Sequence, residues 1–475
     1  MERFHNSKSS RLILSTLAAA IESVRPAPLI KHAVKFSNSK LTVRNIYGNV
    51  AKVGEFDRVY IVGAGKATLG MAYAVCSILD NKVAAGAITV PYGTKAKEIK
   101  RVLVTEASHP IPDKAGIKGT RNILSILRKA DQNDLVVFLI SGGGSALMPL
   151  PASGISLANK QKITSLLLRS GASIHEINVV RKHLSAVKGG QLLRHVNSSC
   201  ALLSLIISDV IGDNLGMIAS GPTCPDSSTF MDASNILRKY RIEGPAAAIQ
   251  YIAKGAKGKI KETPKPQDEL FSRIHNVLIG NNAIACKAAV GYLKKRGMQA
   301  VNLGSEFDGE AKEFGAFLAQ RALGLGRKRL AIVAGGETTV KLGRGKNGLG
   351  GRNQEAALSC LAELDRHDVA IGCIGTDGID GNSDAAGALV SPKTIMLAKK
   401  MDLEKYLNMH DSYHAFKKLN SLIFTGFTGT NVNDIAVVCP ELKQDRTHLI
   451  LEEDRHIALV SELHKRRNNI ANSKT

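Results

Sequence analysis

A glycine turn that carries one lysine follows the apolar run at residues 59–62. The turn lacks the outer glycine and the hydroxyl residue of a Walker loop, and Thr68 stands where a dinucleotide fingerprint needs its third glycine. A strand-to-helix turn still offers backbone amides to an anion, and Lys66 adds a full positive charge. We therefore predict that Gly63, Gly65 and Lys66 bind an anionic group. An ordinary tight turn with a solvent-facing lysine is the alternative.

A second glycine turn follows the wholly apolar run at residues 135–140. Three successive glycines let a ligand approach the backbone closely and leave amides free for oxyanions. The last serine resembles the nucleophile of a hydrolase elbow, but the second glycine of that motif is missing. The pattern favours an anion cradle over a nucleophile, and a plain glycine turn is the alternative. The predicted binding residues are Ser141, Gly142, Gly143, Gly144 and Ser145.

Two further groups of charged residues lie in the first half of the chain. Arg181 and Lys182 lie on a helical pattern and suit a phosphate or a carboxylate, unless they form a basic solvent face. Asp209 and Asp213 follow the apolar run at 202–207, where they could hold Mg²⁺ or act as a general base. Two helix-capping aspartates would give the same pattern.

The second half of the chain repeats this arrangement. Glu337 ends an apolar run, and Asp377 follows another. A basic glycine loop at 343–351 leads into a helical pattern that begins with Arg352 and Asn353. A glycine loop before a helix N-terminus suits phosphate, although an exposed mobile loop would look similar. We predict that Glu337, Arg352, Asn353 and Asp377 belong to the site.

These residues must be positioned by strands that alternate with helices. Such alternation predicts a parallel sheet with helices on both faces, and ligands bind such sheets at the carboxyl ends of the strands. A chain of 475 residues exceeds one ordinary core, so two domains are expected. The Lys- and Pro-rich stretch at 256–268 predicts a boundary near residue 265, with the strand at 275–280 opening the second domain. The pattern predicts nucleotide-dependent transfer to a small anion in an interdomain cleft.

Composition narrows the class of protein. A net charge of +23 would suit a nucleic-acid binder, but aromatic residues make up only 4% and Trp is absent. Seven scattered cysteines indicate reduced thiols in a reducing compartment. No apolar run reaches the length of a membrane span. We expect a cytoplasmic protein, with the mitochondrion as the alternative because the N-terminal stretch combines basic and apolar residues.

The ordered motifs resemble those of the glycerate 2-kinase family from about residue 12 to residue 438. They are GAGKA, SHPIPD, SGGGSALMPLP, NVVRKHLSAVKGGQL, LIISDVIGDNLGMIASGPT, GGETTVKLG, GGRNQEAAL, GTDGIDG, DAAGA and TGTNVND. The resemblance implies an α/β fold with a Rossmann-like N-terminal domain at 10–265 and a smaller MOFRL-containing α/β domain at 270–440. A charged tail follows at 441–475.

The resemblance also implies an activity, ATP- and Mg²⁺-dependent phosphorylation of D-glycerate to 2-phospho-D-glycerate. It makes Lys66 the substrate lysine and Arg352 the catalytic arginine. Asp209 or Asp213 would accept the hydroxyl proton or hold the metal ion. The competing readings are a nicotinamide-dependent hydroxy-acid oxidoreductase and a basic nucleic-acid-binding protein. We expect neither nucleic-acid nor membrane partners, and the sequence leaves the oligomeric state open.

Overall fold

The computed structural model forms two compact units, each described by itself. The N-terminal unit spans Pro26–Gly280, and the C-terminal unit combines the chain up to Arg25 with the chain from Asn281 onward. The predicted ranges of 10–265 and 270–440, and the predicted cleft between domains, remain predictions. The tail at 441–475 lies outside the described residues except for its first two. The structure describes residues 7–94, 98–196, 200–325, 329–343, 347–365 and 368–442.

A six-stranded parallel sheet forms the centre of the N-terminal unit, in the order β6-β5-β4-β7-β8-β9. All residues of β4 and β7 are buried, as continuous apolar runs in a doubly covered parallel sheet should be. The predicted parallel sheet is confirmed. The strands are β4 (Val59–Ala64), β5 (Val83–Pro91), β6 (Val102–Ala107), β7 (Leu135–Ile140), β8 (Ala201–Ile207) and β9 (Ile274–Gly280).

The strand order reverses between β4 and β7. From β4 the chain adds β5 and β6 on one side, and it then returns to add β7, β8 and β9 on the other. Loops that leave two such neighbours diverge, and ligands of doubly wound sheets bind in the crevice between them. The turns at 63–67 and 141–145, both predicted to bind anions, leave the sheet at this crevice.

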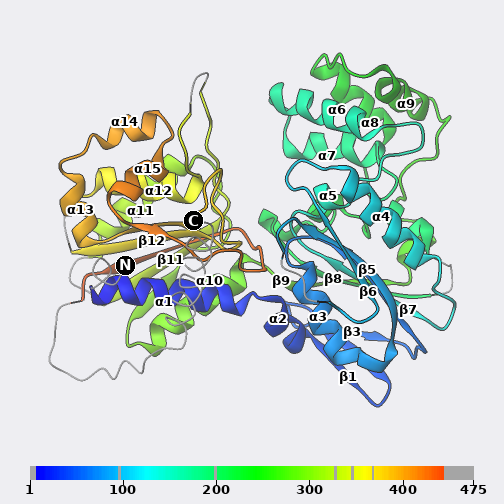
Figure 1. Cartoon of the computed structure of the whole chain (residues 1–475), viewed down its shortest axis with the longest axis horizontal. Helices are drawn as coiled ribbons and strands as arrows, with labels where there is room; N and C mark the ends of the chain where they lie inside the picture. The colour runs from blue at the N-terminus through cyan, green and yellow to red at the C-terminus, as the bar shows by residue number, and fades with distance from the viewer. Residues whose placement is uncertain are drawn as a thin grey trace, which may run out of the picture. The chain divides into compact units, whose positions relative to one another are not determined.

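Four helices of this unit pack against one another as a separate layer with its own apolar core (Figure 1). This layer consists of α6 (Leu157–Arg169), α7 (Ile174–His183), α8 (Phe230–Lys239) and α9 (Ala246–Ala256). Serine or threonine capping boxes begin α6, α7 and α8 and satisfy backbone amides that a helix start leaves unpaired. The remaining elements are α2 (Pro26–Ala33), α3 (Thr68–Leu79), α4 (Lys114–Leu127), α5 (Gly144–Leu147) and a small antiparallel sheet of β1 (Val34–Ser37), β2 (Lys40–Arg44) and β3 (Val50–Val53).

Strand β9 belongs to the N-terminal sheet, where it pairs with β8. The sequence analysis assigned this strand to the second domain because a Lys- and Pro-rich stretch precedes it. That stretch forms no helix or strand beyond Ala256, but it is held within the N-terminal unit. The Thr263 hydroxyl donates to the buried carboxylate of Asp226 at 3.1 Å, and Arg194 donates to the carbonyl of Glu262. Local composition therefore marked an irregular segment within the N-terminal unit.

The C-terminal unit contains a mixed six-stranded sheet in the order β10-β11-β15-β12-β13-β14. Strand β15 runs antiparallel to both of its neighbours. Figure 1 shows α1, in blue, beside α10 although the two are far apart in sequence, and Ser9 ties α1 to β15 by donating to the Pro440 carbonyl at 2.9 Å. The strands are β10 (Gln299–Asn302), β11 (Leu330–Gly336), β12 (Val369–Gly375), β13 (Gly387–Val390), β14 (Leu422–Ile423) and β15 (Asp434–Pro440). The helices are α1 (Lys8–Ser23), α10 (Asn282–Lys295), α11 (Ala311–Leu323), α12 (Arg352–Glu363), α13 (Pro392–Ala398), α14 (Leu403–Asn408) and α15 (Ser412–Lys418).

The described residues contain no single helix that is long and apolar enough to cross a membrane. Helices α1 and α2 meet that test only as a pair, by length and composition.

Candidate functional site

The turns after β4 and β7 are joined by hydrogen bonds at the switch point of the N-terminal sheet. The Lys66 amide donates to the Gly142 carbonyl at 2.8 Å, and the Ala67 amide donates to the Ser141 hydroxyl at 3.1 Å. Ser141 is fully buried, so these bonds are shielded from water. The two turns, which the sequence analysis took separately, thus form one rigid structure.

This close packing explains two of the glycines. A Cβ atom on Gly63 would lie 2.1 Å from the Leu139 carbonyl oxygen, inside the strand ladder. A Cβ on Gly65 would lie 2.1 Å from the Ser141 hydroxyl, and Gly65 also has a φ of +149°. Thr68, which interrupts the dinucleotide fingerprint, is buried, and its hydroxyl donates to the Leu139 carbonyl at 3.4 Å. Gly63 therefore allows β4 to pair closely with β7, and Gly65 allows the turns after these strands to touch.

Lys66 and His109 both lie beside Gly143. This glycine has a φ of +81°, and a Cβ on it would lie 3.0 Å from His109 Cδ2 and 3.3 Å from Lys66 Cγ. The three residues come from the loops after β4, β6 and β7, which the strand order brings to one edge of the sheet. The sequence analysis singled out Lys66 and Gly143 but not His109, whose motif SHPIPD served only for the family resemblance.

A cavity of about 620 Å³ opens beside this edge. It is lined by the loops after β6 and β7, by α6 and α7, and by the loop after α7. Gly143, Ser145 and Arg181, all predicted binding residues, lie on its wall together with Lys160 and Lys188. No Asp or Glu is among the lining residues. The wall of the cavity therefore carries basic side chains and no carboxylate, which favours an anion.

Burial lowers the pKa of all three cations in this wall. Burial first, and then the charge of Arg181, lowers the pKa of Lys160 to about 7. The pKa of Lys188 is lowered well below its usual value by burial and by the charges of Lys160 and Arg181. Burial also lowers the pKa of Arg181. Within the described chain, none of the three forms an ion pair with a carboxylate, so no acid of the protein stabilises their charged forms.

Lys188 also holds the second glycine turn. Its ammonium donates to the Ser145 carbonyl at 2.8 Å and lies 2.9 Å from the Ser145 hydroxyl. That hydroxyl also lies 2.8 Å from the hydroxyl of Ser220. A serine of the hydrolase-elbow type would need a histidine and an acid, but the partners of Ser145 in the described structure are an amine and a hydroxyl. This environment fits the anion cradle that the sequence favours.

The remaining predicted residues of this half lie in different surroundings. Lys182 pairs with the buried carboxylate of Asp226 at 3.3 Å and does not line the cavity. Asp209 follows β8, the neighbour of β7, and Asp213 lies in the short turn after it with a φ of +54°. The described residues contain no group of three or more His, Cys, Asp or Glu side chains that could hold a metal ion.

In the C-terminal unit, Arg352 is the centre of a second polar cluster. The guanidinium, at the start of α12, donates to both carboxylate oxygens of Asp434 and, at 2.8 Å, to Glu337. Burial alone would lower the pKa of Arg352, but the carboxylates of Asp434 and Glu337 raise it above its usual value. Arg352 therefore stays charged, and these hydrogen bonds hold its guanidinium group in one orientation.

Asn353 connects this ion pair to a second buried acid. Its amide group donates to Asp434 at 2.9 Å and to Asp380 at 3.2 Å, and the Asp380 carboxylate also accepts from the backbone amides of Asn353 and Gln354. Burial raises the pKa of Asp380 to about 6, although these hydrogen bonds oppose the rise. Burial raises the pKa of Asp434 although Arg352 and Asn353 oppose the rise, and the charge of Asp377, just after β12, adds to it. The structure thus gathers the predicted residues Glu337, Arg352, Asn353 and Asp377.

Asp434 and Asp380 are the members of this cluster that the sequence analysis did not select. Both lie in motifs that it quoted: TGTNVND could be an ordinary polar turn by itself, and in GTDGIDG, a motif with acids at a strand end, only Asp377 was selected. Asp434 faces Arg352 because β15 inserts between β11 and β12, and sequence spacing gave no sign of this insertion. The only sequence signal for Asp434 was its position at the end of a polar motif, directly before an apolar run.

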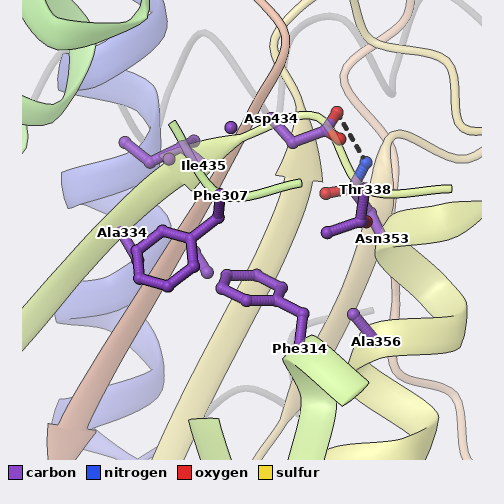
Figure 2. Close-up of a pocket in the computed structure, with 11 residues that line it drawn as sticks. Phe307, Phe314, Ala334, Thr338, Asn353, Ala356, Asp434 and Ile435 are labelled. Carbon is purple, nitrogen blue, oxygen red and sulfur yellow. Dashed lines mark hydrogen bonds between the residues drawn. The ribbon is translucent and has the colours of Figure 1, made fainter. Parts of the chain in front are cut away.

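A small cavity lies next to the same cluster. Figure 2 shows the hydrogen bond between Asn353 and Asp434 on one side and the rings of Phe307 and Phe314 on the other. The ring centroids are 5.1 Å apart. The cavity measures about 10 Å³, roughly the space of one water molecule. It is too small for a substrate, and it separates the polar cluster from the apolar interior.

A doubly wound parallel sheet with a basic cavity beside the carboxyl ends of its strands places the N-terminal unit among α/β proteins of the Rossmann type. The family profile for the domain of unknown function DUF4147 matches residues 12–253, and the MOFRL family profile matches residues 330–434.

Curated relatives match nearly the whole chain. A glycerate 2-kinase from Pyrococcus horikoshii is 43% identical over 91% of this chain and 98% of its own length. A D-glycerate 2-kinase from Thermotoga maritima is 41% identical over 90% and 97%. A protein from Agrobacterium vitis named as a candidate hydroxypyruvate reductase is 41% identical over 80% and 87%.

A solved structure agrees with these relatives. The crystal structure of a glycerate kinase from Thermotoga maritima superposes with a TM-score of 0.77 at 39% identity, covering 90% of this chain and 99% of the other. The chain belongs to the glycerate kinase family. The resemblance and the two-domain α/β fold class that the sequence analysis gave are confirmed.

Proposed function

We propose that this protein transfers the γ-phosphoryl group of ATP to the 2-hydroxyl of D-glycerate, giving 2-phospho-D-glycerate. The observation that carries the proposal is the 43% identity to a glycerate 2-kinase over nearly the full length of both chains. The cation-lined cavity at the switch point supports it, because both substrates of such a reaction are anions.

Phosphoryl transfer asks a protein mainly for positioning and for compensation of negative charge. In this proposal the Lys66 ammonium binds the glycerate carboxylate or the moving phosphoryl group. Its backbone amide donates to the Gly142 carbonyl, so the glycine turns fix the backbone from which the lysine side chain extends before substrate arrives. Preorganised charge of this kind acts without reorganisation during the reaction.

Arg352 is proposed to stabilise charge on the transferring phosphoryl group. Its fork is oriented by Asp434 and Glu337, and about a third of its side chain remains exposed, 31%. In this role Asp434 and Glu337 would be positioning residues, since they act on the substrate through Arg352. Asn353 would hold Asp434 through its hydrogen bond.

Asp209 and Asp213 are proposed as the acids that meet the metal ion or the reacting hydroxyl. One or two carboxylates at a strand end suit Mg²⁺, because this ion keeps several waters and completes its shell with substrate phosphates. A donor set of two carboxylates therefore fits the ion, although the described residues hold no cluster of three such ligands. Bound Mg²⁺ would neutralise phosphate charge. The carboxylate of either residue that is not bound to the metal would accept the hydroxyl proton.

A coupled assay with ATP and D-glycerate tests the proposal, with phosphorus NMR identifying the phosphorylated carbon. We expect glycerate-dependent release of ADP and a product phosphorylated at carbon 2. Lys66→Ala should lower kcat by about 10²-fold or more, as loss of a preorganised charge contact typically does. Near wild-type turnover by a folded Lys66→Ala variant would remove Lys66 from the mechanism.

A second candidate function is reduction of hydroxypyruvate, which the name of the Agrobacterium vitis relative favours. The interrupted fingerprint at Thr68 counts against a nicotinamide site. Oxidation of NADH or NADPH on addition of hydroxypyruvate, without ADP release from ATP and glycerate, would favour this reading. Steeply salt-dependent retention of DNA or RNA, again without ADP release, would instead favour the nucleic-acid binder.

We further propose a reducing compartment, the cytoplasm. All seven cysteines are free thiols, and six of them are buried. Burial raises the pKa of Cys76 and Cys200 to about 11, so these thiols stay protonated and unreactive. Fractionation of cells expressing the tagged full chain tests this against the mitochondrial alternative.

A further inference from the structure

We propose that the cavity lined by Lys160, Arg181 and Lys188 is the pocket for the phosphate chain of the nucleotide. The inference rests on the proposed function, because it takes ATP as the phosphoryl donor. It adds two binding residues that were not predicted: Lys160, on α6, which lies in none of the sequence motifs, and Lys188, on the loop after α7, which lies in the motif NVVRKHLSAVKGGQL.

The charges in the cavity are the first support. Three cations from three segments face one space, and no carboxylate lines it. Lys160 is 7% exposed and Lys188 is 2% exposed, so water compensates neither charge well. The hydrogen-bond partners of these two ammonium groups are carbonyl and hydroxyl oxygens, from Pro149 and Ser145. Burying unpaired cations is costly unless an anion completes the site.

The number of charges favours a polyphosphate over a carboxylate. Burial lowers the pKa of both lysines, so their ammonium forms need a negative charge beside them, and one carboxylate, such as that of glycerate, could not pair with both lysines and with Arg181. A triphosphate carries several negative charges along a short chain and can meet Lys160, Arg181 and Lys188 together. Arg181 adds a planar fork, which suits phosphate oxygens in particular.

The size and the apolar surface of the cavity give the second support. A volume of about 620 Å³ lies within the usual range for nucleotide-sized ligands, and a three-carbon acid would occupy only a small part of it. Ile111 and Leu168 line the same cavity, and their side chains are 67% and 57% exposed. These apolar surfaces would be covered by the base and ribose when the phosphates lie on the cations.

Two variants on different helices test the pocket, Lys160→Met on α6 and Arg181→Gln on α7. The matched control is Lys162→Met, which removes an exposed lysine from α6 that does not line the cavity. Isothermal titration in a phosphate-free buffer measures ATP binding, with inorganic tripolyphosphate as competitor. Circular dichroism and thermal unfolding check that each variant is folded. If one cavity variant misfolds, ATP binding by the other cavity variant tests the pocket.

We expect each cavity variant to weaken ATP binding by about tenfold to a hundredfold, as loss of a charged hydrogen bond implies. Tripolyphosphate should compete with ATP in the wild type, and KM for D-glycerate at saturating ATP should change little in the variants. Folded variants that bind ATP like the wild type would overturn the pocket, and so would an increase in KM for D-glycerate alone. If the wild type binds ATP and the variants bind it weakly, but no glycerate is phosphorylated, the pocket stands and the proposed reaction falls.

Discussion

Lys160→Met should stabilise the protein at neutral pH. In the folded protein, burial first and then the nearby charge of Arg181 disfavour the ammonium form, so the pKa of Lys160 is about 7 against an ordinary value of 10.5. The unfolded chain therefore binds this proton more tightly than the folded chain. Below about pH 7, Lys160 lowers the free energy of unfolding by its full amount. This effect disappears as the pH rises toward about 10.5.

The size of the effect follows from the two pKa values. A pKa that falls from 10.5 to about 7 costs the folded state about 4 kcal/mol at pH 7 and about 2 kcal/mol at pH 9. Methionine fills a similar volume without charge, but it leaves the Pro149 carbonyl without the ammonium donor at 2.9 Å. That loss costs about 1 kcal/mol at either pH. The net gain should therefore be about 3 kcal/mol at pH 7 and about 1 kcal/mol at pH 9.

Urea unfolding of the wild type, Lys160→Met and Lys162→Met at about pH 7 and about pH 9 measures this difference. Phosphate buffers and nucleotides are left out, because an anion in the cavity would stabilise the wild-type ammonium group. The exposed control should be neutral at both values. A gain that is equal at the two pH values, or a Lys160→Met variant that is less stable at pH 7, would falsify the account of an uncompensated buried cation.

Three other predictions rest on separate contacts. Binding of ATP at about pH 8 should take up at least close to one proton, since Lys160 is then mostly neutral in the free protein and the pKa of Lys188 is lowered too. Calorimetry in buffers of different ionisation enthalpy measures the uptake, and no uptake contradicts it. Arg352→Met should destabilise the protein by about 3–5 kcal/mol, because it leaves the Asp434 carboxylate buried and unpaired. Adding Asp434→Asn to this variant should restore part of the lost stability in thermal unfolding, and no restoration would argue against the ion pair. Gly65→Ala should cost about 2 kcal/mol or more, because its Cβ meets the Ser141 hydroxyl, and unchanged urea unfolding would contradict that clash.

Much of the N-terminal fold could be predicted from the sequence, because its strands are buried on both faces. The runs at 59–62, 135–140 and 202–207 coincide with β4, β7 and β8, and each ends in the turn that the sequence marked. Strand β9 was assigned to the other domain, since nothing local distinguishes the last strand of one sheet from the first strand of the next. Only its backbone pairing with β8 decides that question.

The sequence analysis predicted the residues of the candidate site one by one, but it did not predict which of them contact one another. Glycine turns can be recognised from local composition, so Gly65, Gly143 and Lys66 could be selected from the spacing of residues along the chain. Lys160 could not, because a lysine in a helical pattern usually faces solvent. Its burial depends on how α6 packs against the loop after β7, which is a property of the folded unit.

The sequence by itself determined the chemistry available to this protein: glycine turns at strand ends, cations and acids beside them, and motifs of one enzyme family. The tertiary structure decided which of these residues act together. Strand order brought the loops of β4 and β7 into contact, and the insertion of β15 set Asp434 against Arg352. Helix packing gathered Lys160, Arg181 and Lys188 around one cavity without a carboxylate. The physical reason is that local spacing fixes which groups a turn or helix carries, whereas burial and charge compensation depend on segments that are distant in sequence.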